Sequence, residues 1–196
     1  MRRTQGQGRK KCHRELVAAA LSAVALAAAT PNVAVAAIDI FLKIGDIKGE
    51  SVDSKHKAEI DVLSWSWGVV GPIRNSAKQP QTPVGPAQPS CAQDISIQKP
   101  VDKASPVLFA KAAAGVPIPT ATFAVRKSGE DPQDFLVITL SDVLVTSVSQ
   151  SGAGGGGGPT ESVSFGFSSA KVSYKPQSDD GTTADAIVAD VPGSCR

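Results

Sequence analysis

Hydrophobic and polar residues alternate along most of the chain after residue 36, with the period of two that is typical of half-buried β-strands. This alternation covers residues 38–44, 57–69, 94–99, 120–127, 134–140, 142–149 and 161–175. Turns rich in glycine, proline and aspartate separate most of the stretches, so seven or eight short strands are expected. Little more than Ser141 separates 134–140 from 142–149, which could be joined by a sharp bend or form one long bent strand. The chain is therefore predicted to be mainly β, folded as a compact two-sheet β-barrel or sandwich.

One strand is irregular. In residues 59–69 (EIDVLSWSWGV) the apolar positions shift by one residue between Val62 and Leu63. A β-bulge or a bend at this point would carry the strand from one part of the wall to another. Trp65 and Trp67 follow the shift and lie two residues apart, so they should point to the same face and can fill the core together.

A single helix is expected at about residues 103–115, flanking the sheets. Ser105 and Pro106 fit an N-cap followed by proline in the first helical position, although Asp102 could cap a slightly earlier start. Gly115 is suited to end the helix. The helix has a short apolar face that could cover one side of a sheet.

The N-terminus, residues 1–36, resembles a cleavable signal peptide. A basic start is followed by the apolar run LVAAALSAVALAAAT and the small-residue pattern Ala34-Val35-Ala36. This run is too short and too rich in alanine for a membrane span, so stable membrane insertion is not expected. Cleavage there would leave 14 basic and 17 acidic residues, and such a mildly acidic body does not favour nucleic-acid binding.

The body divides into a domain at residues 37–181 and a C-terminal tail at 182–196, with a short strand expected near 186–189. Within the domain, residues 70–92 contain five prolines and little periodicity, so an extended Pro-rich loop is expected. The glycine run 154–158 lacks the residues that complete a phosphate-binding loop and is interpreted as a hairpin connection.

No catalytic, cofactor-binding or metal-binding residues can be assigned from the sequence. His56 is the sole histidine after the leader, and no nucleophile motif accompanies it. A small extracellular hydrolase using His56 as its base is kept as a distant alternative. Cys91 and Cys195 are the two cysteines outside the leader; they could form one disulfide or remain two independent thiols.

Five segments, in order and with compatible spacing, resemble the Hcp (hemolysin-coregulated protein) family, which forms the tube of type VI secretion systems. They are AIDIFLKIGDIKGES, EIDVLSWSWGV, QDISIQKPVDKASPVLF, VRKSGEDPQDFLVITLSDVLVTS and PTESVSFGFSSAKVSYKPQSDDG. The resemblance covers about residues 37–181. It implies an Hcp-like fold and a non-enzymatic protein that forms hexameric rings, which stack into a tube able to carry effectors.

The resemblance also implies partners: further copies of the chain, spike and sheath proteins of the secretion system, and small effector proteins. It places residues 70–92 where the family has a loop that contacts neighbouring rings, and it offers Trp65 and Trp67 a second role as subunit contacts. The leader favours a secreted or periplasmic mature protein; without a working leader, the protein would be cytoplasmic before type VI export. The alternative function is an exported Hcp-like structural or binding module that acts outside the secretion machine.

Overall fold

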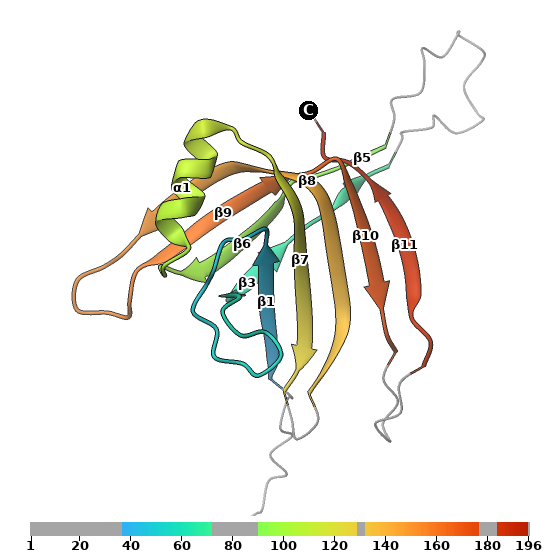
Figure 1. The fold of residues 1–196 in the computed structure, drawn as a ribbon, viewed down its shortest axis with the longest axis horizontal. Coiled ribbons are helices and arrows are strands. Elements are labelled where there is room, and N and C mark those ends of the chain that lie inside the picture. Colours follow the sequence, from blue (N-terminus) through green and yellow to red (C-terminus); the bar gives the residue numbers. More distant parts are fainter. Residues whose placement is uncertain (1–36, 72–89, 129–131, 177–183, 196) are drawn as a thin grey trace, which may run out of the picture. The chain divides into compact units, whose positions relative to one another are not determined.

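Eleven strands and one α-helix form the part of the chain that the computed structural model describes, residues 37–71, 90–128, 132–176 and 184–195 (Figure 1). The expected leader at 1–36 and most of the expected Pro-rich loop, residues 72–89, lie outside these described residues. The strands are β1 (Ile38–Ile44), β2 (Ile60–Asp61), β3 (Ser64–Ser66), β4 (Val69–Val70), β5 (Cys91–Ala92), β6 (Ile95–Pro100), β7 (Ile118–Lys127), β8 (Gln133–Ser151), β9 (Thr160–Gly166), β10 (Ser169–Tyr174) and β11 (Ile187–Pro192), and the helix is α1 (Ser105–Ala114).

Two antiparallel sheets share strand β8 and together follow the order β2-β1-β7-β8-β9-β6-β3. Strands β10 and β11 extend the first sheet from the other edge of β8, and β4 pairs with β5 separately. The mainly β fold with one helix is confirmed. The two sheets do not close into a barrel, because the two end strands of the path, β2 and β3, do not pair with each other. The two strands follow each other within one short segment of the chain and do not lie side by side.

Strand β8 is one long strand, where the sequence suggested either two strands or one bent strand. Its first half pairs with β7 and β10, and its second half pairs with β9. The direction changes at Asp142, whose φ of 50° lies in the left-handed region. Because of this bend, one continuous strand contributes to both sheets and places its inward side chains over a common core.

The core lies between the two sheets and is almost entirely aliphatic and aromatic. Phe123 of β7 and Phe165 of β9 meet edge to face, with ring centres 6.2 Å apart. Leu42 of β1 and Ile97 of β6 are also buried in this cluster. Strands β6 and β9 bury alternate residues, as the sequence pattern predicted, whereas β1 and β7 also bury consecutive ones.

Helix α1 contacts β8 and buries Ser105 and Leu108. The helix begins at Ser105, so Pro106 lies in its second position and the expected Ser105 cap is wrong: no side chain caps the helix. Instead, Asp102 accepts a hydrogen bond from the N–H of Ala104 at 2.9 Å and stabilises the turn before it. Gly115 ends the helix with a φ of 59°, as expected. This helix is too short to cross a membrane, and no other helix was found in the described ranges that could do so.

The residues expected to form a tail contain strand β11, which pairs with β10 along its whole length. The strand starts one residue later and ends three residues later than the short strand expected at 186–189. It belongs to the same compact unit as the rest of the described chain. After it, Ala92 of β5 donates a hydrogen bond to the carbonyl of Gly193 at 3.0 Å, so the end of the chain lies beside β5 (Figure 1).

Candidate functional site

The irregular segment after β2 carries the chain from one sheet to the other. The N–H of Val62 donates to the carbonyl of Ile40 in β1 at 2.9 Å, whereas the N–H of the next residue, Leu63, donates to the carbonyl of Gln98 in β6 at 2.8 Å. Val62 is buried, but Leu63 is 59% exposed. The bend predicted from the shift in apolar phase is therefore present, and it coincides with the change of sheet.

Trp65 and Trp67 are both half-buried and pack against the core. Trp67 meets Phe167 edge to face, with ring centres 5.9 Å apart, and its indole N–H donates to the carbonyl of Gln93 at 3.1 Å. Their contacts within the domain agree with the core interpretation. The exposed part of each ring is still accessible to another subunit, so the second interpretation stays a prediction.

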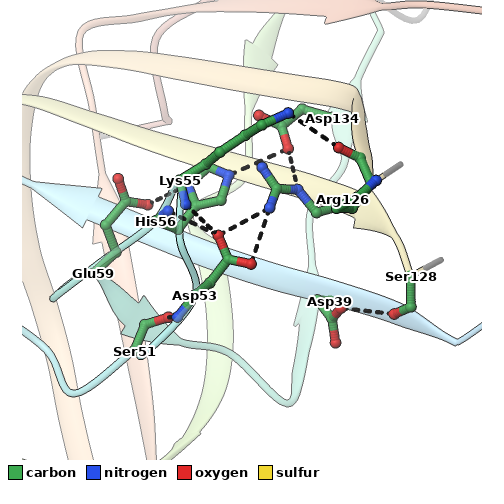
Figure 2. Close-up of polar contacts among 10 residues, drawn as sticks. Asp39, Ser51, Asp53, Lys55, His56, Glu59, Arg126, Ser128 and Asp134 are labelled. Atoms are coloured by element: carbon green, nitrogen blue, oxygen red, sulfur yellow. Dashed lines mark hydrogen bonds and ion pairs between the residues drawn. The ribbon is translucent and has the colours of Figure 1, made fainter. Parts of the chain in front are cut away.

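A buried ionic cluster surrounds His56, in the loop between β1 and β2 (Figure 2). Its Nδ1 lies 2.8 Å from Glu59 Oε2 and its Nε2 lies 3.2 Å from Asp134 Oδ1 of β8. The imidazole ring stacks on Phe41 of β1 at a centroid distance of 4.4 Å. A ring that is stacked and flanked by two carboxylates is held in one orientation.

Arg126, at the end of β7, completes this cluster. Its Nε donates to Asp134 Oδ1 at 2.8 Å, and its Nη1 donates to both carboxylate oxygens of Asp53, at 2.9 and 3.0 Å (Figure 2). The guanidinium carbon lies 5.7 Å from the centre of the Phe41 ring, close enough for a cation–π contact. The side chain is almost fully buried, so its charge depends on these partners.

Two carboxylates of this cluster, those of Asp53 and Asp134, are held in the ionised form. Burial raises the pKa of Asp134, but the hydrogen bonds and charges of Arg126 and His56 outweigh it, so the pKa lies below its ordinary value. The backbone N–H of His56 is the main cause that lowers the pKa of Asp53, and Arg126 adds to it. Both nitrogens of the His56 ring face carboxylate oxygens and the ring stacks on Phe41, an arrangement that suits a structural clamp better than a catalytic base.

A second buried cluster joins α1 to the sheets. The ammonium group of Lys99 in β6 donates to Glu161 Oε1 of β9 and to Asp102 Oδ1, both at 2.7 Å. Ser105 Oγ of α1 donates to the same Glu161 oxygen at 2.8 Å. Burial raises the pKa of Glu161, but the hydrogen bonds from Lys99, Gln150 and Ser105 outweigh it and hold this pKa below its ordinary value.

A cavity of about 480 Å³ lies between α1 and the turn after β1. Three lysines, Lys48, Lys103 and Lys111, line it together with one acidic residue, Asp46, and its remaining walls are largely apolar. Neither this cavity nor the two ionic clusters was predicted from the sequence. No group of three or more metal-ligating side chains was found in the described ranges.

The structure brings Cys91 and Cys195 together in a disulfide, with Cα atoms 5.1 Å apart. Cys91 stands opposite Val70 in the short β4–β5 ladder, which flanks residues 72–89. Cys195 follows β11, and its N–H donates to the carbonyl of Ala92 at 2.8 Å. The pair therefore connects the end of the chain to the stem of the expected Pro-rich loop.

Comparison with known proteins agrees with the fold. Residues 41–174 match the family described as "Type VI secretion system effector, Hcp". The chain is 43% identical over 146 residues to protein hcp1 of Pseudomonas aeruginosa, which covers 74% of this chain and 88% of that protein. The chain belongs to the Hcp family. The resemblance inferred from the five sequence segments is confirmed.

Solved Hcp structures also share the fold. Hcp1 of Salmonella typhimurium is 36% identical, with a TM-score of 0.61 and coverage of 80% of this chain and 94% of that one. A type VI secretion system effector from Yersinia pestis is 30% identical, with a TM-score of 0.63 and coverage of 79% and 99%. This Hcp chain is thus a ring-forming, structural tube protein of type VI secretion, and secretion by that system agrees with the expected extracellular destination.

Proposed function

We propose that this Hcp protein acts as a hexameric tube and effector-carrier protein without catalytic activity, exported after removal of a leader that ends at Ala36. Its complete two-sheet scaffold, matched by the family along residues 41–174, is the observation that carries the proposal. The structural use of His56 supports the absence of catalysis, because both of its ring nitrogens face carboxylates. Spike, sheath and small effector proteins are the proposed partners.

Apolar side chains on the edge strand β11 and its neighbour β10 support assembly into rings. Ile187 and Val188 of β11 are 64% and 54% exposed, and Tyr174 lies opposite Ile187 on β10. Strand β11 pairs with β10 alone, so its outer edge is free among the described residues. A free edge with exposed apolar residues favours contact with another chain, and a contact between unlike surfaces closes into a ring when the rotation allows it.

Native mass spectrometry of the purified protein tests the ring directly, with negative-stain microscopy as a second view. We expect hexamers at micromolar concentration, and a Val188→Glu variant should shift the population towards monomers. Val52→Glu is the matched control, because Val52 is 95% exposed in a loop and should not affect assembly. Monomers alone in the wild-type protein would contradict the ring.

The alternative is an exported Hcp-like module that acts outside the secretion machine. The basic and apolar leader favours it, because export by a signal peptide does not require a type VI apparatus. Cell fractionation with N-terminal sequencing, in cells with and without type VI sheath proteins, separates the two functions. A mature protein that begins at Ala37 and leaves the cytoplasm without the sheath proteins would favour the alternative. Uncleaved cytoplasmic protein would exclude the alternative and would also contradict the leader removal proposed above.

A further inference from the structure

We propose that Cys91 and Cys195 form a thiol-oxidation site whose disulfide fastens the C-terminal strand β11 to β5 once the protein reaches an oxidising compartment. One cysteine of the site, Cys195, lies beyond residues 41–174, which carry the family match, whereas Cys91 lies within them. The proposal does not depend on ring formation. It depends on the hydrogen bonds that hold residues 193–195 beside β5.

Backbone contacts bring the two cysteines together without help from the sulfur–sulfur bond. Ala92, next to Cys91, both donates to Gly193 at 3.0 Å and accepts from Cys195 at 2.8 Å. These two hydrogen bonds align the strands at the distance that a disulfide requires, with Cα atoms 5.1 Å apart. The reduced thiols are thus placed for oxidation in the folded protein.

Ser194, which lies between Gly193 and Cys195, is also held by hydrogen bonds, in this case to Phe167. The N–H of Ser194 donates to the carbonyl of Phe167 at 2.9 Å, and Ser194 Oγ accepts from the N–H of Phe167 at 3.0 Å. A Cβ atom added at Gly193 would lie 2.5 Å from the carbonyl oxygen of Ser168, so the chain can approach this closely only with glycine there. The end of the chain thus has one defined position beside Cys91.

Strand β11 has little else to hold it. It is an edge strand with a single neighbour, and five of its six residues are exposed. Only Val191 is half-buried and packs against the core. Elements with few buried apolar contacts open most easily from the native state, so a covalent bond just beyond Pro192 should have its largest effect on this strand.

The chemistry is thiol–disulfide exchange with a small disulfide oxidant such as oxidised glutathione. The thiolate of one cysteine attacks a sulfur of the oxidant and releases one thiolate, leaving a mixed disulfide. The thiolate of the second cysteine attacks this mixed disulfide and releases the second thiol. The cysteine pair loses two electrons and two protons, and the oxidant is reduced to two thiols. Cytoplasmic reductants keep the pair reduced, so the bond should form after export.

Hydrogen exchange measured by mass spectrometry on the full chain tests the proposal, after treatment with oxidised glutathione. We expect the amides of β11 to exchange at least about tenfold faster in Cys195→Ser than in the oxidised wild type, while those of β7 stay unchanged. Cys12→Ser is the matched control: it is the same substitution in the leader, and it leaves the pair intact. Reduction of the wild type with dithiothreitol should reproduce the effect of Cys195→Ser.

Three results would overturn the proposal. Two alkylatable thiols remaining in Cys12→Ser after glutathione treatment would show that the pair does not oxidise. A ladder of disulfide-linked copies on a non-reducing gel would show that the cysteines join different chains. Equal exchange of β11 in Cys195→Ser and oxidised wild type would show that the bond does not hold the strand. Native mass spectrometry of the same samples reports ring formation separately, so failure of the tube function is distinguishable.

Discussion

Replacing Lys99 with methionine should strongly destabilise the protein, because it removes the one cation from a buried cluster of acidic groups. Lys99 is fully buried and contacts Glu161 and Asp102, each at 2.7 Å. In Lys99→Met, Glu161 keeps only the neutral donors Ser105 and Gln150. Loss of one partner from a buried ion pair costs about 3–5 kcal/mol in the free energy of unfolding. For a domain of this size, that lowers the Tm by about 6–20 °C.

Urea unfolding followed by tryptophan fluorescence measures this change. Lys171→Met is the matched control: Lys171 is exposed on β10, and its loss should alter the free energy of unfolding by less than about 0.5 kcal/mol. The double variant Lys99→Met/Glu161→Met should be more stable than Lys99→Met alone, because it no longer buries an unbalanced carboxylate. A Lys99→Met protein within about 1 kcal/mol of the wild type would refute the reasoning, as would a double variant with fully additive losses.

Three further predictions concern the backbone and pH. Gly49→Ala should lower the free energy of unfolding by several kcal/mol, because its Cβ would lie 2.2 Å from the carbonyl oxygen of Glu59; Gly157→Ala, with open space around it, should be nearly neutral in the same urea titration. Ala58→Gly should stabilise by up to about 1 kcal/mol, because Ala58 has a φ of 60°; an unchanged or lower urea midpoint would contradict this. Thermal melts should show a loss of stability below about pH 4. The pKa of Asp134 is lower in the folded protein than in the unfolded chain, so its ionised form stabilises the fold at a pH above the unfolded pKa. This contribution is lost as the pH falls through the folded pKa. A melting temperature that stays constant from pH 6 to pH 2.5 would contradict this expectation.

Alternation predicted the strands well where local polarity and three-dimensional pairing agree. Strand β1 has the bounds that its alternation indicates, and a turn at Gly45 ends it. Strand β8 was harder to predict, because Ser141 and Asp142 are polar and look like a turn. Asp142 instead bends the strand between its ladder with β7 and its ladder with β9, which begins at Leu144 and has a register shift between Val145 and Ser147. The open barrel was missed for a related reason: alternation shows which face a residue takes and carries no information about whether the two end strands pair.

The buried charges were missed because a charged residue is normally interpreted as exposed. A signal was nevertheless present for one cluster. Lys99 continues the inward phase of Ile95 and Ile97, and Glu161 precedes Val163 in the same way on the neighbouring strand. The two charged residues are direct partners in the ladder between β6 and β9. Two opposite charges, each in the inward phase of its strand, therefore predict a buried pair once the pairing of the strands is known.

No comparable signal was available for His56, Arg126 and Asp134. They come from a loop and two strand ends, and their meeting depends on how the loop folds back over β1. Arg126 follows three consecutive buried residues of β7. This run breaks the alternation, so the pattern does not predict which face of the sheet the Arg126 side chain occupies. The cluster could be identified only after the fold was known.

The two buried ionic clusters and the disulfide share one physical role. Each stabilises an element that makes few contacts with the apolar core. Lys99 and Glu161 fasten α1, Arg126 fastens the loop around His56, and the disulfide fastens β11, while β1, β7 and β8 are held by buried aliphatic and aromatic residues. If this division is correct, each link should control the hydrogen exchange of its own element first. A conservative change such as Glu161→Gln should then accelerate exchange in α1 and leave β11 protected, because the two elements are fastened by separate links.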